Sequence, residues 1–193
     1  MDELDQAQLL QLALEATRNR QRETAISVLK QATSRADATA QAHYLLGAEY
    51  AQIQLYERAI GEIEAALALD ATLHTAKLQL ALLYFGASKS DMAILTLASL
   101  VTLPETDPLH HFGKGLMDVA RSAFSDAKAR LAAGIALNNT NSALNVDMQR
   151  IIDAIDKAVG LHPAATVPDE NELPTDPSAR HIFLMAYGNS KNN

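Results

Sequence analysis

The chain of 193 residues contains no cysteine and no tryptophan, and only 5% of its residues are aromatic. Without cysteine it can form no disulfide framework, cysteine-ligated zinc site, iron–sulfur centre or thiol nucleophile. Its net charge of −7 supplies no basic surface for DNA or RNA. No run of about 18 apolar residues is present to span a membrane. The N-terminus, Met1-Asp2-Glu3, is acidic where a signal peptide is basic. These absences predict a soluble protein, which we expect in the cytoplasm.

What the chain has in abundance is small apolar residues. It contains 35 alanines, and 48% of its residues are apolar. This fraction excludes a fully disordered chain and is sufficient for a sizeable core. Alanine is the strongest helix former, and its small side chain lets helices approach closely. The composition therefore predicts an all-α fold with closely packed helices.

The sequence repeats itself every 34 residues. One column of the repeat holds alanine in all four copies: Ala25, Ala59, Ala93 and Ala127. Four residues later comes a large aliphatic residue in each copy: Leu29, Ile63, Leu97 and Leu131. Twelve residues before each alanine stands a small residue: Ala13, Gly47, Ala81 and Gly115. Each copy also holds two apolar runs of helical period separated by a short break, which predicts a helix–turn–helix. We expect the small residue of the first helix to face the alanine of the second, because the helices cross closely there.

The second copy carries a further resemblance. Its columns read His43, Leu46-Gly47, Tyr50, Ala59, Ile63 and Ala66, and the chain here resembles the tetratricopeptide repeat family. The closing proline of the family pattern is replaced by Ala71, and the fourth copy has Lys114 and Asp118 where the family usually has Leu and Tyr. The resemblance covers residues 6–141, in copies 6–39, 40–73, 74–107 and 108–141. It implies an all-α, right-handed α-solenoid of about four hairpins, with a role in binding proteins.

The C-terminal third of the chain has two further parts. Ser142–Val159 reads as an amphipathic capping helix that completes a repeat domain over residues 1–159, and Gly160 is its expected stop. Residues 160–193 form a proline-rich, acidic linker followed by a short apolar tail. The linker, about 17 residues long, could span about 50 Å when extended. We predict that the tail docks on an apolar surface of this chain or of a second copy; the alternatives are that it packs beside the capping helix or stays disordered. Its docking residues would be Ile182, Phe183, Leu184 and Tyr187.

The resemblance also implies which residues face a partner. In tetratricopeptide arrays the first helices line a concave groove through the second, fifth, ninth and twelfth columns. Here these columns hold Ala7, Leu10, Leu14, Thr17, Gln41, Tyr44, Ala48, Ala51, Thr75, Leu78, Leu82, Phe85, Leu109, Phe112, Leu116 and Val119. We predict an apolar protein-binding groove formed by Leu10, Leu14, Tyr44, Ala48, Leu78, Leu82, Phe85, Leu109, Phe112, Leu116 and Val119. A carboxylate clamp needs Lys, Asn and Arg on these columns, and they are lacking.

These features predict a protein-interaction module rather than an enzyme. It would bind an apolar peptide or amphipathic helix of another protein, as an adaptor, assembly factor or chaperone. One alternative is a self-associating structural subunit, a homodimer whose tail fills its own or a neighbour's groove. Another is a chaperone for an exported protein. We expect no cofactor, no nucleic acid and no membrane insertion.

Potential chemical sites are weak. His110 and His111 are adjacent on a helix and so point about 100° apart, which makes a poor metal site. We interpret His111 and His43 as packing residues, and expect no metal centre and no catalytic residue.

Overall fold

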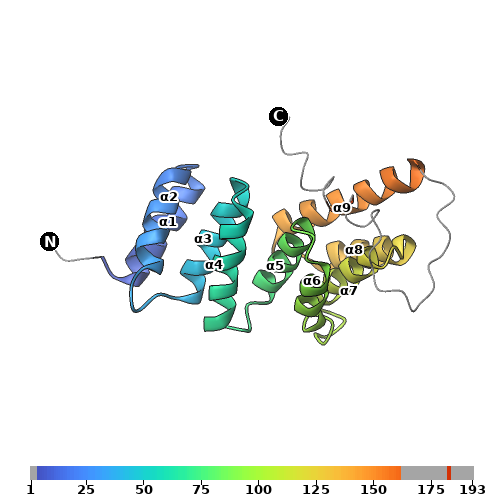
Figure 1. The fold of residues 1–193 in the computed structure, drawn as a ribbon, viewed down its shortest axis with the longest axis horizontal. Helices are drawn as coiled ribbons and strands as arrows, with labels where there is room; N and C mark the ends of the chain where they lie inside the picture. Colours follow the sequence, from blue (N-terminus) through green and yellow to red (C-terminus); the bar gives the residue numbers. More distant parts are fainter. Residues whose placement is uncertain (1–3, 162–181, 184–193) are drawn as a thin grey trace. The chain divides into compact units, whose positions relative to one another are not determined.

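The computed structural model describes residues 4–161 and 182–183. Within these residues the fold is all-α and contains no strand. Its helices are α1 (Gln6–Arg18), α2 (Arg22–Thr33), α3 (Ala40–Gln52), α4 (Tyr56–Leu69), α5 (His74–Gly86), α6 (Ser90–Ala98), α7 (Pro108–Ala120), α8 (Phe124–Leu137) and α9 (Ser142–Leu161) (Figure 1). In the part of the chain so described, no helix combines the length and hydropathy that a membrane crossing requires. The chain divides into two compact units, residues 1–83 and 84–193, so the boundary falls inside α5.

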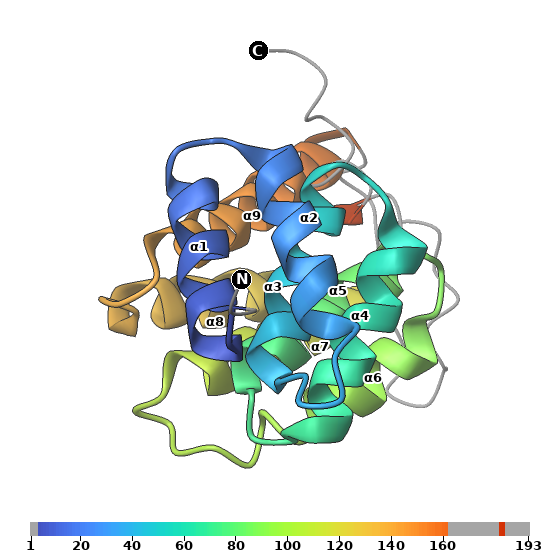
Figure 2. The ribbon, with the colours of Figure 1, turned by 90° about the vertical axis from the view of Figure 1, so that its left-hand side faces the viewer.

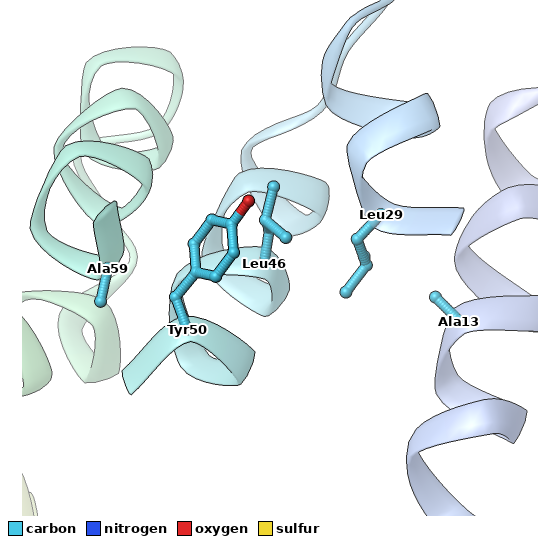
Figure 3. Close-up of a cluster of buried hydrophobic side chains, with 5 residues drawn as sticks. All are labelled: Ala13, Leu29, Leu46, Tyr50 and Ala59. Atoms are coloured by element: carbon cyan, nitrogen blue, oxygen red, sulfur yellow. The ribbon is translucent and has the colours of Figure 1, made fainter. Parts of the chain in front are cut away.

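Unit 1 contains the hairpins α1–α2 and α3–α4 and the first part of α5. Figures 1 and 2 show α1 and α2 side by side, and α2 also packs on α3. One core cluster contains one buried side chain each from α1, α2 and α4 and two from α3: Ala13, Leu29, Ala59, Leu46 and Tyr50 (Figure 3). Successive hairpins therefore share a core, as expected where a single hairpin cannot bury its own apolar face.

Unit 2 contains the end of α5 and helices α6 to α9. In this unit α7 packs on both α6 and α8, and α9 packs on α8. Two histidines hold the α6–α7 connection. His110 Nδ1 lies 2.8 Å from the carbonyl oxygen of Leu103, and His111 Nε2 lies 2.7 Å from that of Glu105. These contacts give the histidine pair a structural role.

The repeat appears in the backbone at the turn inside each hairpin. Arg20, Gln54, Ser88 and Ser122 adopt left-handed conformations with φ between 58° and 63°, and they lie 34 residues apart. The next residue's amide in each copy bonds to the carbonyl five residues back, for example Leu55 to Tyr50 at 2.9 Å. This pattern is the Schellman motif, which satisfies the last carbonyl groups of a helix. The first helices begin at Gln6, Ala40, His74 and Pro108, so their starts show the same period.

The expected close crossings occur where the small residues meet the second helix. A Cβ atom added to Gly47 would lie 2.6 Å from Ile63 Cγ1 and 3.1 Å from the carbonyl oxygen of Ala59. A Cβ atom added to Gly115 would lie 2.8 Å from Leu131 Cδ2. The prediction that small residues allow the two helices to approach is thereby confirmed in the second and fourth copies.

The predicted capping helix Ser142–Val159 is longer in the structure than expected. Helix α9 continues through Gly160 to Leu161, so the predicted stop at Gly160 is wrong. Gly160 has no left-handed backbone conformation of the kind that ends helices. Most of the predicted linker and the tail residues Leu184 and Tyr187 lie outside the described residues.

Candidate protein-interaction surface

In unit 1, the predicted binding residues of α1 and α3 lie on the first helices of two adjacent hairpins. Leu10, Leu14, Tyr44 and Ala48 are half-buried. Leu10 packs against two core clusters, so part of its side chain belongs to the core. Burial raises the pKa of the Tyr44 phenol, which keeps that side chain neutral. This face therefore offers partly accessible apolar surface without charge on the named residues.

A buried carboxylate fixes the position of α3 beside α1 and α2. Glu49 is only 4% exposed. Thr17 Oγ1 of α1 donates a hydrogen bond of 2.8 Å to Glu49 Oε1, and Arg22 Nε of α2 lies 3.4 Å from Glu49 Oε2. Buried carboxylates require such partners. Sequence reasoning missed this contact; the signal was an acidic residue inside the apolar run of residues 45–51.

Two further predicted groove residues of unit 1 lie on α5 and are not open. Leu78 is 0% exposed and Leu82 is 6% exposed. Neither side chain offers surface to a ligand in this conformation. The partly accessible part of the predicted groove in unit 1 is therefore the α1–α3 face, which we define as Leu10, Leu14, Tyr44 and Ala48.

In unit 2 most predicted groove residues are part of the interior. Leu109 is half-buried, whereas Phe112, Leu116 and Val119 are fully buried. A Cβ atom added to Gly134 of α8 would lie 2.5 Å from the Phe112 ring, so this ring packs on the glycine. The picture of an open apolar surface at these positions needs correction: Phe112 fills a space on α8 that other residues at position 134 would occupy. The sequence signal was the presence, in the same copy, of an aromatic residue at position 112 and a glycine at position 134.

Phe85, in the last turn of α5, has a partner from the tail. Its ring stacks on that of Phe183, with the ring centroids 4.1 Å apart and the planes inclined by 4°. Phe85 is 2% exposed, and the helical residues Ile182 and Phe183 are 0% and 1% exposed. Both rings belong to unit 2. A residue assigned to the groove and a residue assigned to the tail therefore contact each other directly.

Two of the charged pairs join the two helices of one hairpin. His43 Nδ1 lies 2.7 Å from Glu62 Oε2 between α3 and α4, and Arg130 Nε lies 2.9 Å from Asp118 Oδ2 between α8 and α7. Burial raises the pKa of the Asp118 carboxyl, and the positive charge of Arg130 opposes that shift. Over the residues 4–161 and 182–183, no group of three or more His, Cys, Asp or Glu side chains could hold a metal ion.

Comparison with known proteins locates the chain by its fold. No family model and no curated protein matches the sequence. Among solved structures, one described as "MamA RS-1 ArsTM double mutant" superposes with a TM-score of 0.59 at 13% sequence identity. The match covers 99% of this chain and 100% of that one. Identity this low shows the fold alone, and together with the helices it shows an all-α helical-repeat fold of the solenoid class, similar to the tetratricopeptide type.

Proposed function

We propose that this protein is a non-catalytic interaction module whose α1–α3 face binds an apolar segment of another protein. The observation that carries the proposal is the half-buried, uncharged character of Leu10, Leu14, Tyr44 and Ala48 on adjacent first helices. A helical-repeat fold of this type supports a protein-binding role in general. An amphipathic helix suits the face because its apolar side chains recur at the spacing of successive turns.

The buried Glu49 contact supports this proposal by giving the face a fixed framework. Thr17 and Arg22 hold the carboxylate from α1 and α2, and so keep α3 in place beside them. A face held in advance loses less conformational entropy on binding. Such a module would act as an adaptor, an assembly factor or a chaperone.

Peptide display against the immobilised full-length chain tests the proposal. We expect the selected peptides to carry apolar residues at helical spacing. Tyr44→Glu should weaken their binding at least about tenfold, as measured by fluorescence anisotropy, because a charge would be desolvated at the interface. Leu95→Glu is the matched control, since Leu95 of α6 is 72% exposed and lies outside this face. Circular dichroism and the milder variant Tyr44→Ala guard against misfolding. Equal binding to the wild type and to both Tyr44 variants would contradict the proposal.

A second candidate function is self-association through the tail. The observation that favours it is the stacking of Phe183 on Phe85, because the contact seen within one chain would also form between two copies that exchange their tails. Light scattering over a range of protein concentrations tests the alternative: a dimer that persists on dilution and is lost in Phe183→Ala would favour exchange of tails between copies. A monomer at every concentration would exclude it.

A further inference from the structure

The Phe85–Phe183 contact does not follow from the repeat fold. The residues that share the column of Phe85 are Thr17, Ala51 and Val119. Thr17 is exposed, Ala51 is half-buried, and Val119 is buried without being aromatic. The hairpin forms with small or medium side chains at this position, so its packing does not require a phenylalanine here. The large ring of Phe85 has instead a specific partner in Phe183.

The segment that contacts Phe85 belongs to the C-terminal tail and is separated from the repeats along the chain. Residues 162–181 lie between the end of α9 and Ile182, and four of them are prolines. Ile182 and Phe183 are nevertheless buried almost completely. Phe183 stacks on Phe85, and Ile182 directly before it is buried as well, so the segment at this site is an aliphatic residue followed by an aromatic residue, both in helical conformation. The parallel stacking of the rings adds a geometric requirement to the apolar burial.

We infer that the Phe85 site is a receptor for a short apolar helix led by an Ile-Phe type pair, and that the chain's own tail occupies it as an exchangeable ligand. A partner segment of the same chemistry binds by displacing Ile182 and Phe183. The inference rests on the proposed role as an interaction module, but it concerns a surface of unit 2 that the α1–α3 face does not include. A tethered segment competes at an effective concentration in the millimolar range, so it holds the site against weak ligands.

Binding of the tail peptide in trans tests the inference. The probe is a labelled synthetic peptide of residues 178–193, titrated with the full-length chain. The Phe183→Ala chain should bind this peptide at least about tenfold more tightly than the wild type, because its own tail no longer competes. The Phe85→Ala chain and a peptide carrying Phe183→Ala should show little binding. Leu95→Ala is the matched control chain, altered at an exposed residue of the same unit, and should bind like the wild type.

Three outcomes would overturn the inference. The first is absence of peptide binding by the Phe183→Ala chain. The second is equal binding by that chain and the wild type. The third is loss of helical structure in Phe183→Ala, measured by circular dichroism, which would show that the tail is part of the core rather than a ligand. In that case the conservative Phe183→Leu chain should fold, keep its own tail in the Phe85 site and fail to bind the peptide. Tyr44→Glu should leave the peptide's binding unchanged, so failure here is distinguishable from failure of the α1–α3 proposal.

Discussion

At the scale of single residues, the hairpin turns use a conformation that their side chains do not favour. Arg20, Gln54, Ser88 and Ser122 all have positive φ, and none of them is glycine. For a residue with a Cβ atom the left-handed conformation costs about 1–2 kcal/mol. The Schellman hydrogen bonds offset this cost, because they satisfy the last carbonyl groups of each first helix. These positions are therefore sites where glycine should stabilise the fold.

Ser88→Gly should raise the free energy of unfolding by about 1 kcal/mol, because relief of the left-handed strain exceeds the added entropy of the unfolded chain. Ser88 is exposed, so little packing is lost. The matched control is Ala129→Gly at an exposed position inside α8 of the same unit. That change should lower the free energy of unfolding by about 1 kcal/mol. Urea denaturation measures both, and two changes of the same sign would contradict the argument.

Asp118 should make stability depend on pH. Burial is the main cause that raises the pKa of its carboxyl above 3.8 in the folded state. The folded chain then holds this proton more tightly than the unfolded chain, so the contribution favours folding at low pH and is lost as pH rises through the folded-state pKa. The stability of Asp118→Asn relative to the wild type should therefore increase as the pH rises from about 4 through the folded-state pKa of Asp118.

The companion variant for this pH test is Arg130→Gln. It removes a charge that lowers the pKa of Asp118, so its decline in stability with rising pH should be steeper than in the wild type. Urea midpoints at a series of pH values measure all three chains. Parallel profiles for the two variants and the wild type would show that Asp118 does not titrate differently on folding.

At the scale of helices and hairpins, the distance between two helices is set by single atoms. Gly47→Ala should lower the free energy of unfolding by about 1–3 kcal/mol, because the new methyl group would meet both Ile63 and the backbone of Ala59. Gly61→Ala is the matched control in the same hairpin, since a Cβ atom there meets nothing within 4 Å. It should raise the free energy of unfolding by about 1 kcal/mol through helix propensity. Thermal unfolding of Gly47→Ala and Gly61→Ala measures both effects. A higher melting temperature for both variants would contradict the close approach of the helices at Gly47.

The connection between α8 and α9 depends on a buried amide. Asn138 is 5% exposed; its Nδ2 donates to the Asn141 carbonyl and to Asn145 Oδ1, each at 2.8 Å. Asn138→Ala should cost about 2 kcal/mol, because buried polar partners are left unsatisfied. The neighbouring Asn139→Ala, at an exposed residue, should change stability little. Hydrogen exchange in α9 reports the effect, and equal exchange in the two variants would argue against an anchoring role.

The sequence predicted the elements better than the surface. The 34-residue period predicted the hairpins and their close crossings, because helical period and small residues are local signals. It did not predict that Phe112 is buried, because that depends on the missing side chain of Gly134 in another helix. Nor did it predict the Glu49 contact, which joins three helices and has no counterpart in the repeat pattern. Column position indicates a face of a helix but not what covers that face.

At the scale of the whole molecule, the packing is local. Within unit 1, α1 packs on α2, α2 on α3 and α3 on α4; within unit 2, α6 packs on α7, α7 on α8 and α8 on α9. Stability in such a chain is approximately a sum of repeat terms and nearest-neighbour terms. A local defect should therefore loosen its own hairpin and the adjacent helices more than distant ones.

Gly115→Ala tests this locality, because its new Cβ atom would crowd Leu131 on α8. Native-state hydrogen exchange should accelerate at least about tenfold in α7 and α8 and change less than about twofold in α1 and α2. Gly47→Ala is the reciprocal variant, and it should accelerate exchange in α3 and α4 while leaving α8 and α9 nearly unchanged. Together the two variants distinguish local unfolding of one hairpin from cooperative unfolding of all the repeats. If either glycine change accelerates exchange uniformly along the chain, the repeats unfold as one cooperative block. The nearest-neighbour description would then fail, and a ligand bound at the Phe85 site would stabilise α1 and α2 as strongly as α7.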